Sequence, residues 1–210
     1  FNNNDRPGIL LASALKRYAD LFGVACGEKN ILFTNNDSAY ETALSFIDKG
    51  IKLEAIIDIR ENPNSELVKK VEENQIKIFK GYTLVDTSGY RRINKISIMQ
   101  LSKDGQNVVG NKIEISCDCL GMSGGWTPAV HLFTQSGGKL SFREEDQVFI
   151  PKTYPSKQIS IGSCNGDFSL NSIIKNIPNQ LKEFFAVSST EFDNLDIKSN
   201  EDLTKRNIWL

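Results

Sequence analysis

The stretch from residue 30 to residue 58 decides the fold. It opens with a short apolar run of buried-strand length, Asn30-Ile31-Leu32-Phe33-Thr34, and closes with a second one, Leu53-Glu54-Ala55-Ile56-Ile57-Asp58. Between them a polar turn leads into residues 39–49, whose apolar side chains recur on one helical face before Gly50. Strand, turn, helix and strand within about thirty residues predict the βαβ unit of a parallel sheet.

The neighbouring sequence extends this unit. Residues 9–22 repeat apolar side chains at helical spacing up to Gly23, which predicts a helix that ends there. Residues 65–74 form another amphipathic pattern, followed by a third predicted parallel strand at residues 76–79. From residue 82 to residue 119 apolar and polar residues alternate around a turn at residues 103–107, which predicts an antiparallel β-meander with one solvated face.

The second half of the chain has weaker patterns. A glycine-rich stretch, Gly121-Met122-Ser123-Gly124-Gly125-Trp126-Thr127-Pro128, leads into a predicted short helix near residues 130–133. Two strands are predicted at residues 148–150 and 158–161, then a turn and a helix over residues 168–185. The polar and charged residues at the end predict a linker over residues 188–210.

Composition excludes several classes of protein. With 210 residues, 40% of them hydrophobic, the chain suffices for one sizeable domain or two small lobes. The net charge of −1 and the lack of a basic stripe exclude nucleic acid as a partner, and no apolar run approaches the ~20 residues that cross a membrane. One histidine and four cysteines without a CxxC pair predict no metal site, and reduced cysteines predict a cytoplasmic protein.

Both chain ends have unusual residues. The chain begins with Phe1, not Met, and closes on the apolar cluster Ile208-Trp209-Leu210. We therefore expect an internal piece of a longer protein.

The first turn of the βαβ unit is the main candidate binding site. Such a turn offers backbone N–H groups and a helix N-terminus to a pyrophosphate, and an acid at the end of the second strand takes the ribose hydroxyls. The turn reads Thr34-Asn35-Asn36-Asp37-Ser38-Ala39, and Asp58 follows roughly 20 residues on. A carboxylate repels a 2′-phosphate, so this arrangement predicts NAD and not NADP as the ligand.

The same turn supports a second interpretation. Thr34 and Asn36 occupy the first two glycine positions of the usual pattern, and only Ala39 is a permitted small residue. The side chains of Thr34 and Asn36 would project into the space that a pyrophosphate fills. On this interpretation, the βαβ unit is a scaffold that has lost its ligand. Asp58 would then cap its strand or pair with Arg60. Residues alone leave both interpretations open.

Two further candidates lie downstream. Gly162 and Gly166, with Asp167, bracket a predicted helix N-terminus that would face a dinucleotide in a flanking domain. His131 is the only histidine, and we expect a packed structural residue. We predict no catalytic residue in this chain, because no nucleophile elbow, P-loop or paired-carboxylate motif is present.

The segment from Thr34 to Ala43 resembles the second dinucleotide fingerprint of pyridine nucleotide–disulfide oxidoreductases. Its altered form, taken with Arg6-Pro7-Gly8 upstream, is similar to the alpha subunit of heterotetrameric sarcosine oxidase. Two downstream runs carry the same resemblance, namely Met122 to Phe133 and Cys164-Asn165-Gly166-Asp167-Phe168. The likeness spans about residues 6 to 180.

The resemblance implies a subunit of an enzyme that oxidatively demethylates sarcosine to glycine. In that family the alpha subunit carries an NAD-binding amino-terminal half and a tetrahydrofolate-binding carboxyl half, and FAD and FMN lie on or against the beta subunit. The implied partners are the beta, gamma and delta subunits, and the segment alone would have no turnover. An alpha-type subunit of an FAD-dependent amino-acid dehydrogenase is a related alternative.

Taken together, we predict an α/β protein with a Rossmann-like three-layer NAD-binding-type insert and a β-meander at residues 24–120. Residues 1–23 and 121–187 would be parts of a second, incomplete dinucleotide-binding domain of the flavin/NAD type.

Overall fold

The computed structural model describes residues 1–155 and 157–185. These residues fall into two compact units, which divide between Gly125 and Trp126 and are described separately below. The predicted linker at residues 188–210 lies outside the described residues. Within the described part of the chain, no helix has the length and apolar character that crossing a membrane requires.

A five-stranded parallel sheet forms the centre of the first unit. Its strand order is β1-β8-β2-β3-β4, and every neighbouring pair runs parallel. The strands are β1 (Ile9–Leu11), β2 (Asn30–Thr34), β3 (Leu53–Asp58), β4 (Ile78–Lys80) and β8 (Cys119–Ser123). The predicted βαβ unit and its third parallel strand are confirmed, and so is the α/β class.

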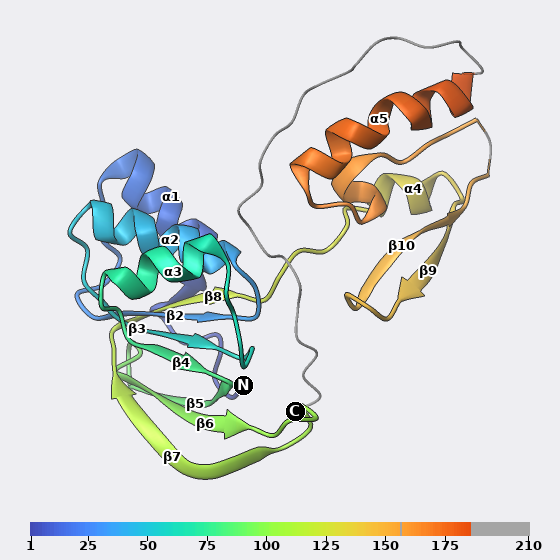
Figure 1. The fold of residues 1–210 in the computed structure, drawn as a ribbon. Coiled ribbons are helices and arrows are strands. Elements are labelled where there is room, and N and C mark those ends of the chain that lie inside the picture. Colours follow the sequence, from blue (N-terminus) through green and yellow to red (C-terminus); the bar gives the residue numbers. More distant parts are fainter. Residues whose placement is uncertain (156, 186–210) are drawn as a thin grey trace. The chain divides into compact units, whose positions relative to one another are not determined.

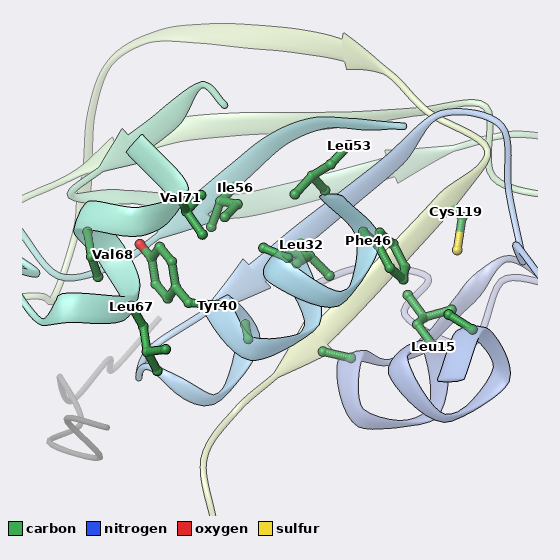
Figure 2. Packing of buried hydrophobic residues seen from close by; sticks show 14 residues of the cluster. Leu15, Leu32, Tyr40, Phe46, Leu53, Ile56, Leu67, Val68, Val71 and Cys119 are labelled. Carbon is green, nitrogen blue, oxygen red and sulfur yellow. The ribbon is translucent and has the colours of Figure 1, made fainter. Parts of the chain in front are cut away.

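Three helices cover one face of this sheet: α1 (Ala12–Phe22), α2 (Ser38–Asp48) and α3 (Glu66–Glu73) (Figure 1). Their apolar side chains pack onto Leu32 and Ile56 from the strands, and Figure 2 shows Tyr40 and Phe46 of α2 within this cluster. Helices α2 and α3 begin and end within one residue of the predicted positions. Gly23, in a left-handed conformation with φ 62°, ends α1 as expected.

The β-meander covers the opposite face of the sheet (Figure 1). It consists of β5 (Tyr82–Ser88), β6 (Lys95–Leu101) and β7 (Val108–Ser116), paired antiparallel in that order. Ile96 and Ile98 of β6 pack against Ile31 and Ile57, which alternate with the helix-facing residues of the parallel strands. Helices, parallel sheet and meander are the three layers that the sequence predicts.

The N-terminal segment differs from its prediction. Residues 9–11 form strand β1 where the sequence predicts the start of a helix, and Ile9 pairs with Leu120 of β8. Ile9 and Leu10 pack into the two clusters on opposite faces of the sheet, as strand residues do. Because these hydrogen bonds tie residues 1–23 into the same sheet as residues 24–120, the first 23 residues belong to the first unit. The boundaries expected from the sequence grouped them with residues 121–187.

Strand β8 lies inside the sheet, between β1 and β2, although its sequence reads as a glycine-rich loop. Gly121 allows this position, because a Cβ there would come within 2.6 Å of a Leu32 methyl carbon and 2.7 Å of a Leu15 methyl carbon. The strand is therefore defined by tertiary packing between a helix and a neighbouring strand.

The second unit is smaller. It contains α4 (His131–Gln135), the antiparallel pair β9 (Lys139–Arg143) and β10 (Val148–Thr153), the 3-10 turn η1 (Gly162–Asn165) and α5 (Leu170–Phe185). The strand predicted at residues 158–161 is wrong, since these residues have no regular structure, and β9 has no counterpart in the sequence predictions. Phe133 and Val148 are its buried apolar residues among those described.

Candidate dinucleotide crevice

The predicted turn lies at the position where this fold ordinarily binds ligands. In the sheet, β2 has β3 on one side and β8 on the other, so the strand order reverses between β2 and β8. In open parallel sheets the ligand crevice lies outside the carboxyl ends of the strands at such a reversal. Thr34 and Ser123, paired in register at these ends, mark this crevice.

Direct hydrogen bonds close the crevice. The Asn35 backbone N–H donates to the Ser123 carbonyl over 3.3 Å, and the Asn35 side-chain amide donates to the Gly124 carbonyl over 3.1 Å. The hydroxyls of Ser38 and Ser123 also share a hydrogen bond, with 2.8 Å between their oxygens. The turn after β2 is thus tied to the end of β8 by its own residues.

Asn36 fills the interior of the turn. Its side chain is fully buried, and its Oδ1 accepts hydrogen bonds from the Ser38 backbone N–H (2.9 Å) and the Ser38 hydroxyl (2.6 Å). Thr34 closes the other end, because its hydroxyl donates to the Asn36 carbonyl over 2.7 Å. Asn36 Oδ1 therefore already accepts a hydrogen bond from an N–H group at the N-terminus of α2, which a phosphate oxygen would need as a donor.

A buried charge network lies beneath the turn. Asp58 Oδ1 accepts from the Arg60 backbone N–H (2.9 Å) and Nε (3.1 Å), and Oδ2 accepts from Arg60 Nη2 (2.8 Å) and the Tyr40 hydroxyl (2.9 Å). Arg60 Nη2 also donates to Asp37 Oδ1 over 2.7 Å. Both carboxylates are fully buried. Asp58 pairs with Arg60, as the scaffold interpretation expected, and both of its oxygens face protein donors and not the surface.

This environment keeps the Arg60 guanidinium charged. Burial favours the neutral form of Arg60, but hydrogen bonds and charges from Asp58 and Asp37 outweigh it and raise the pKa of the guanidinium. Burial, followed by the negative charge of Asp58, raises the pKa of the Tyr40 hydroxyl. Tyr40 therefore stays a neutral donor, and the arginine stays a cation between two acids.

The second predicted site lies before α5. Gly162 and Gly166 flank the 3-10 turn, and Asp167 accepts hydrogen bonds from the Ser169 backbone N–H (3.2 Å) and the Ser172 hydroxyl (2.6 Å). These residues lie directly before α5, close to the helix start that the sequence predicts. The helix N–H of Ser172 donates to the Ser169 hydroxyl, and Asp167 holds both of these serines. Contact of this turn with a dinucleotide remains a prediction.

The remaining candidates have structural explanations. His131 is exposed at the start of α4, so the expectation of a packed histidine is wrong. The spacing of Cys117 and Cys119 in the sequence predicts that they share one face of a strand, but they pack into clusters on opposite faces of the sheet. Burial raises the pKa of both thiols to about 12. The described residues contain no group of three metal-ligating side chains.

Similarity to known proteins identifies the family. No family model matches the chain. It is 31% identical over 166 residues to sarcosine oxidase subunit alpha of Corynebacterium sp. (strain U-96), which covers 79% of this chain and 17% of that protein. The protein of the same name from strain P-1 is 30% identical over 176 residues, 83% of this chain and 18% of that protein.

This chain is a homologue of a segment of the sarcosine oxidase alpha subunit. It spans less than a fifth of the length of these two relatives, both of which are oxidoreductase subunits. The resemblance inferred from residues 6 to 180 is thereby confirmed.

Solved structures support the fold of this sarcosine oxidase alpha homologue. L-proline dehydrogenase from P. horikoshii superposes with a TM-score of 0.52 at 20% identity, covering 78% of this chain and 27% of that chain. Mycobacterium tuberculosis FprA in complex with NADPH superposes with a TM-score of 0.52 at 12% identity, covering 90% and 63%. At these identities the likeness shows a shared Rossmann-type fold.

The crevice does not fit a dinucleotide in the arrangement described. The Asn36 side chain fills the space above the α2 N-terminus, and Asp58 has no exposed surface to offer to a ribose. The fold supplies the binding position, whereas the side chains close it.

Proposed function

We propose that this chain is a structural segment of the alpha subunit of a sarcosine oxidase, an enzyme that oxidatively demethylates sarcosine to glycine, and that its β2–α2 crevice is closed to nucleotides. The observation that carries the proposal is the pair of hydrogen bonds from Asn35 and Ser38 across the mouth of the crevice, together with the Asn36 side chain that fills the turn behind them. The segment serves as a rigid three-layer scaffold and contributes no catalytic group of its own.

Energetics favour the closed crevice. A pyrophosphate would have to displace the Asn36 side chain and break the hydrogen bonds that Asn35 and Asn36 make in the turn. Each of these hydrogen bonds contributes about 1 kcal/mol net. It would also approach two buried carboxylates that share a single arginine. The phosphates of a dinucleotide could accept hydrogen bonds from the α2 N-terminus only after the turn had opened.

Titration of the 210-residue chain with NAD tests the closed crevice. We expect no heat of binding by isothermal titration calorimetry up to millimolar NAD for the native chain. Replacing Asn35 and Asn36 together by glycine removes the obstructing side chains and should produce measurable binding. An Asn74→Gly variant, altered at the exposed end of α3, is the matched control for general destabilisation. Micromolar NAD binding by the native chain would overturn the closed crevice.

NAD binding at the crevice is the second candidate function. The specific observation in its favour is the pair of half-buried hydroxyls, Ser38 at the start of α2 and Ser123 at the carboxyl end of β8, where a phosphate would ordinarily lie. The same titration separates the two candidates, because it measures occupancy of this crevice directly.

The wider assembly is part of the same proposal. We infer beta, gamma and delta subunits as partners, with FAD, FMN and tetrahydrofolate bound outside this segment. Turnover of sarcosine by the full-length enzyme, and none by the 210-residue chain, is the expected result. Preference of the full-length enzyme for another amino acid over sarcosine would instead assign it to the FAD-dependent amino-acid dehydrogenases.

A further inference from the structure

Helix α1 is apolar on two sides. One side, formed by Ala12, Leu15 and Ala19, is buried against the sheet, as Figure 2 shows for Leu15. The other side carries large apolar side chains that are exposed. Its large members and their exposed fractions are Tyr18 45%, Leu21 63% and Phe22 65%. The two sides are adjacent, so at 100° per residue the apolar arc spans about 180°, and the other half of the helix carries Ser13, Lys16, Arg17 and Asp20. This apolar arc is wider than the stripe that a surface helix ordinarily buries.

The exposed side has the spacing of a helix face that packs against a partner. Ala14, Tyr18, Leu21 and Phe22 stand at positions i, i+4, i+7 and i+8. At 100° per residue they fall within about 100° of one another, which is the width of the apolar stripe that a helix ordinarily buries. We call these four residues the α1 seam.

The seam is organised before any partner binds. Tyr18 and Phe22 lie one turn apart, and their ring centroids are 6.1 Å apart. Ala14 is half-buried and small, so the backbone of a partner could approach the helix closely at that end. The seam therefore offers a large apolar surface at its carboxyl end and a shallow one at its amino end.

Helix α2 does not cover the α1 seam. It contacts a different side of α1, where Asp20 accepts a hydrogen bond from the Ser45 hydroxyl and pairs with Lys49, both over 2.6 Å. Asp20 lies about 160° around the helix from Tyr18, at 100° per residue. The seam therefore faces away from α2.

Charge selects the kind of partner. Arg17 is exposed and borders the seam, because it lies three residues after Ala14 and four before Leu21. Lys16 lies on the side of α2 and already pairs with Asp20. In an antiparallel pair with a second copy of α1, like flanks meet, so the two Arg17 flanks would face each other. A partner with carboxylates along its flank complements this seam better than a second copy does.

We propose that the α1 seam is a docking site for an amphipathic α-helix of another polypeptide, with an apolar stripe flanked by acidic residues. This role goes beyond the closed crevice, since the seam and the crevice share no residue.

A designed peptide tests the proposal. The probe is a fluorescein-labelled helix of about 18 residues, roughly five turns, with leucine along one face and glutamate on the flanks. A matched probe has lysine on the flanks. Fluorescence anisotropy with the 210-residue chain should show micromolar binding of the glutamate probe. Binding of the lysine probe should be about threefold weaker for each charge pair that is lost.

Three variants locate the binding. Leu21→Glu should weaken binding of the glutamate probe about tenfold or more, because the contact loses a buried leucine and gains a charge that repels the probe. Arg17→Glu should reverse the preference between the two probes. Val109→Glu, at an exposed apolar position on β7, is the control and should leave both affinities unchanged. The altered side chains are exposed in the chain alone, so circular dichroism should show intact folding.

Three results would overturn the proposal. The first is absence of binding by the glutamate probe. The second is equal affinity of the native chain for the two probes, with no loss of affinity in the Leu21→Glu variant. The third is a reversible dimer in sedimentation equilibrium that Leu21→Glu dissociates, because this would assign the seam to a second copy.

Discussion

The turn before α2 and the turn before α5 both precede a helix N-terminus, and the sequence predicts both as dinucleotide contacts, but they are built differently. The first, at residues 34–39, follows strand β2 and is filled by the Asn36 side chain over buried charges. The second follows a 3-10 turn and has left-handed glycines and an acid, Asp167, that is hydrogen-bonded to Ser169 and Ser172. The difference teaches that a fold can keep the backbone of a ligand site while side chains replace the ligand.

The largest expected effect concerns the charges beneath the filled turn. Arg60→Ala leaves Asp37 and Asp58 buried without their shared cation, which should lower the free energy of unfolding by about 3–5 kcal/mol. Urea denaturation followed by circular dichroism measures the loss. Lys80→Ala, which breaks the exposed pair with Glu72, is the control and should cost about 1 kcal/mol or less. Equal losses in both variants would show that the network does not support the turn.

The turn before α5 should instead depend on its backbone. Gly166 has φ 80°, and a Cβ at this position would come within 2.8 Å of the Ile150 side chain and 2.9 Å of Arg143 Nη2. Gly166→Ala should therefore destabilise the second unit by about 1–3 kcal/mol. Thermal unfolding monitored by hydrogen exchange in α5 measures this effect. Gly124→Ala, where a Cβ meets open space, is the control, and an equal shift there would contradict the prediction.

The smallest effect is a pH dependence confined to the first unit. Cys117 and Cys119 have pKa values of about 12, raised from 9.0 by burial, so the folded chain holds these protons above the pH at which an unfolded thiol releases them. Their contribution to stability is fully present below about pH 9 and is lost as pH rises towards 12. Urea unfolding at pH 8 and pH 10 should show the decline, and Cys117→Ala should reduce it. A steeper decline in that variant would contradict this assignment.

How far the sequence predicts the site can be judged from Asp58 and Asn36. The sequence places both residues correctly, at the end of β3 and within the turn, because strand and helix periods are local properties of the chain. It leaves open whether Asp58 contacts a ribose or pairs with Arg60. That choice depends on where side chains point, and Tyr40 and Asp37, two of the partners that direct Asp58 and Arg60 inward, carry no signal for it in the sequence.

By itself the sequence determined the βαβ unit, the meander and the positions of both turns, because hydrophobic periodicity and turn residues act over a few residues. The family followed from the resemblance of particular runs, such as Thr34 to Ala43. Only the tertiary structure decided that residues 9–11 form a strand, that β8 lies between β1 and β2 in the sheet and that side chains fill the crevice. Each of these depends on hydrogen bonds between residues far apart in the chain, such as Ile9 with β8 and Asn35 with Gly124. Short segments adopt the conformation that their distant neighbours can pair with, and no local pattern records that choice.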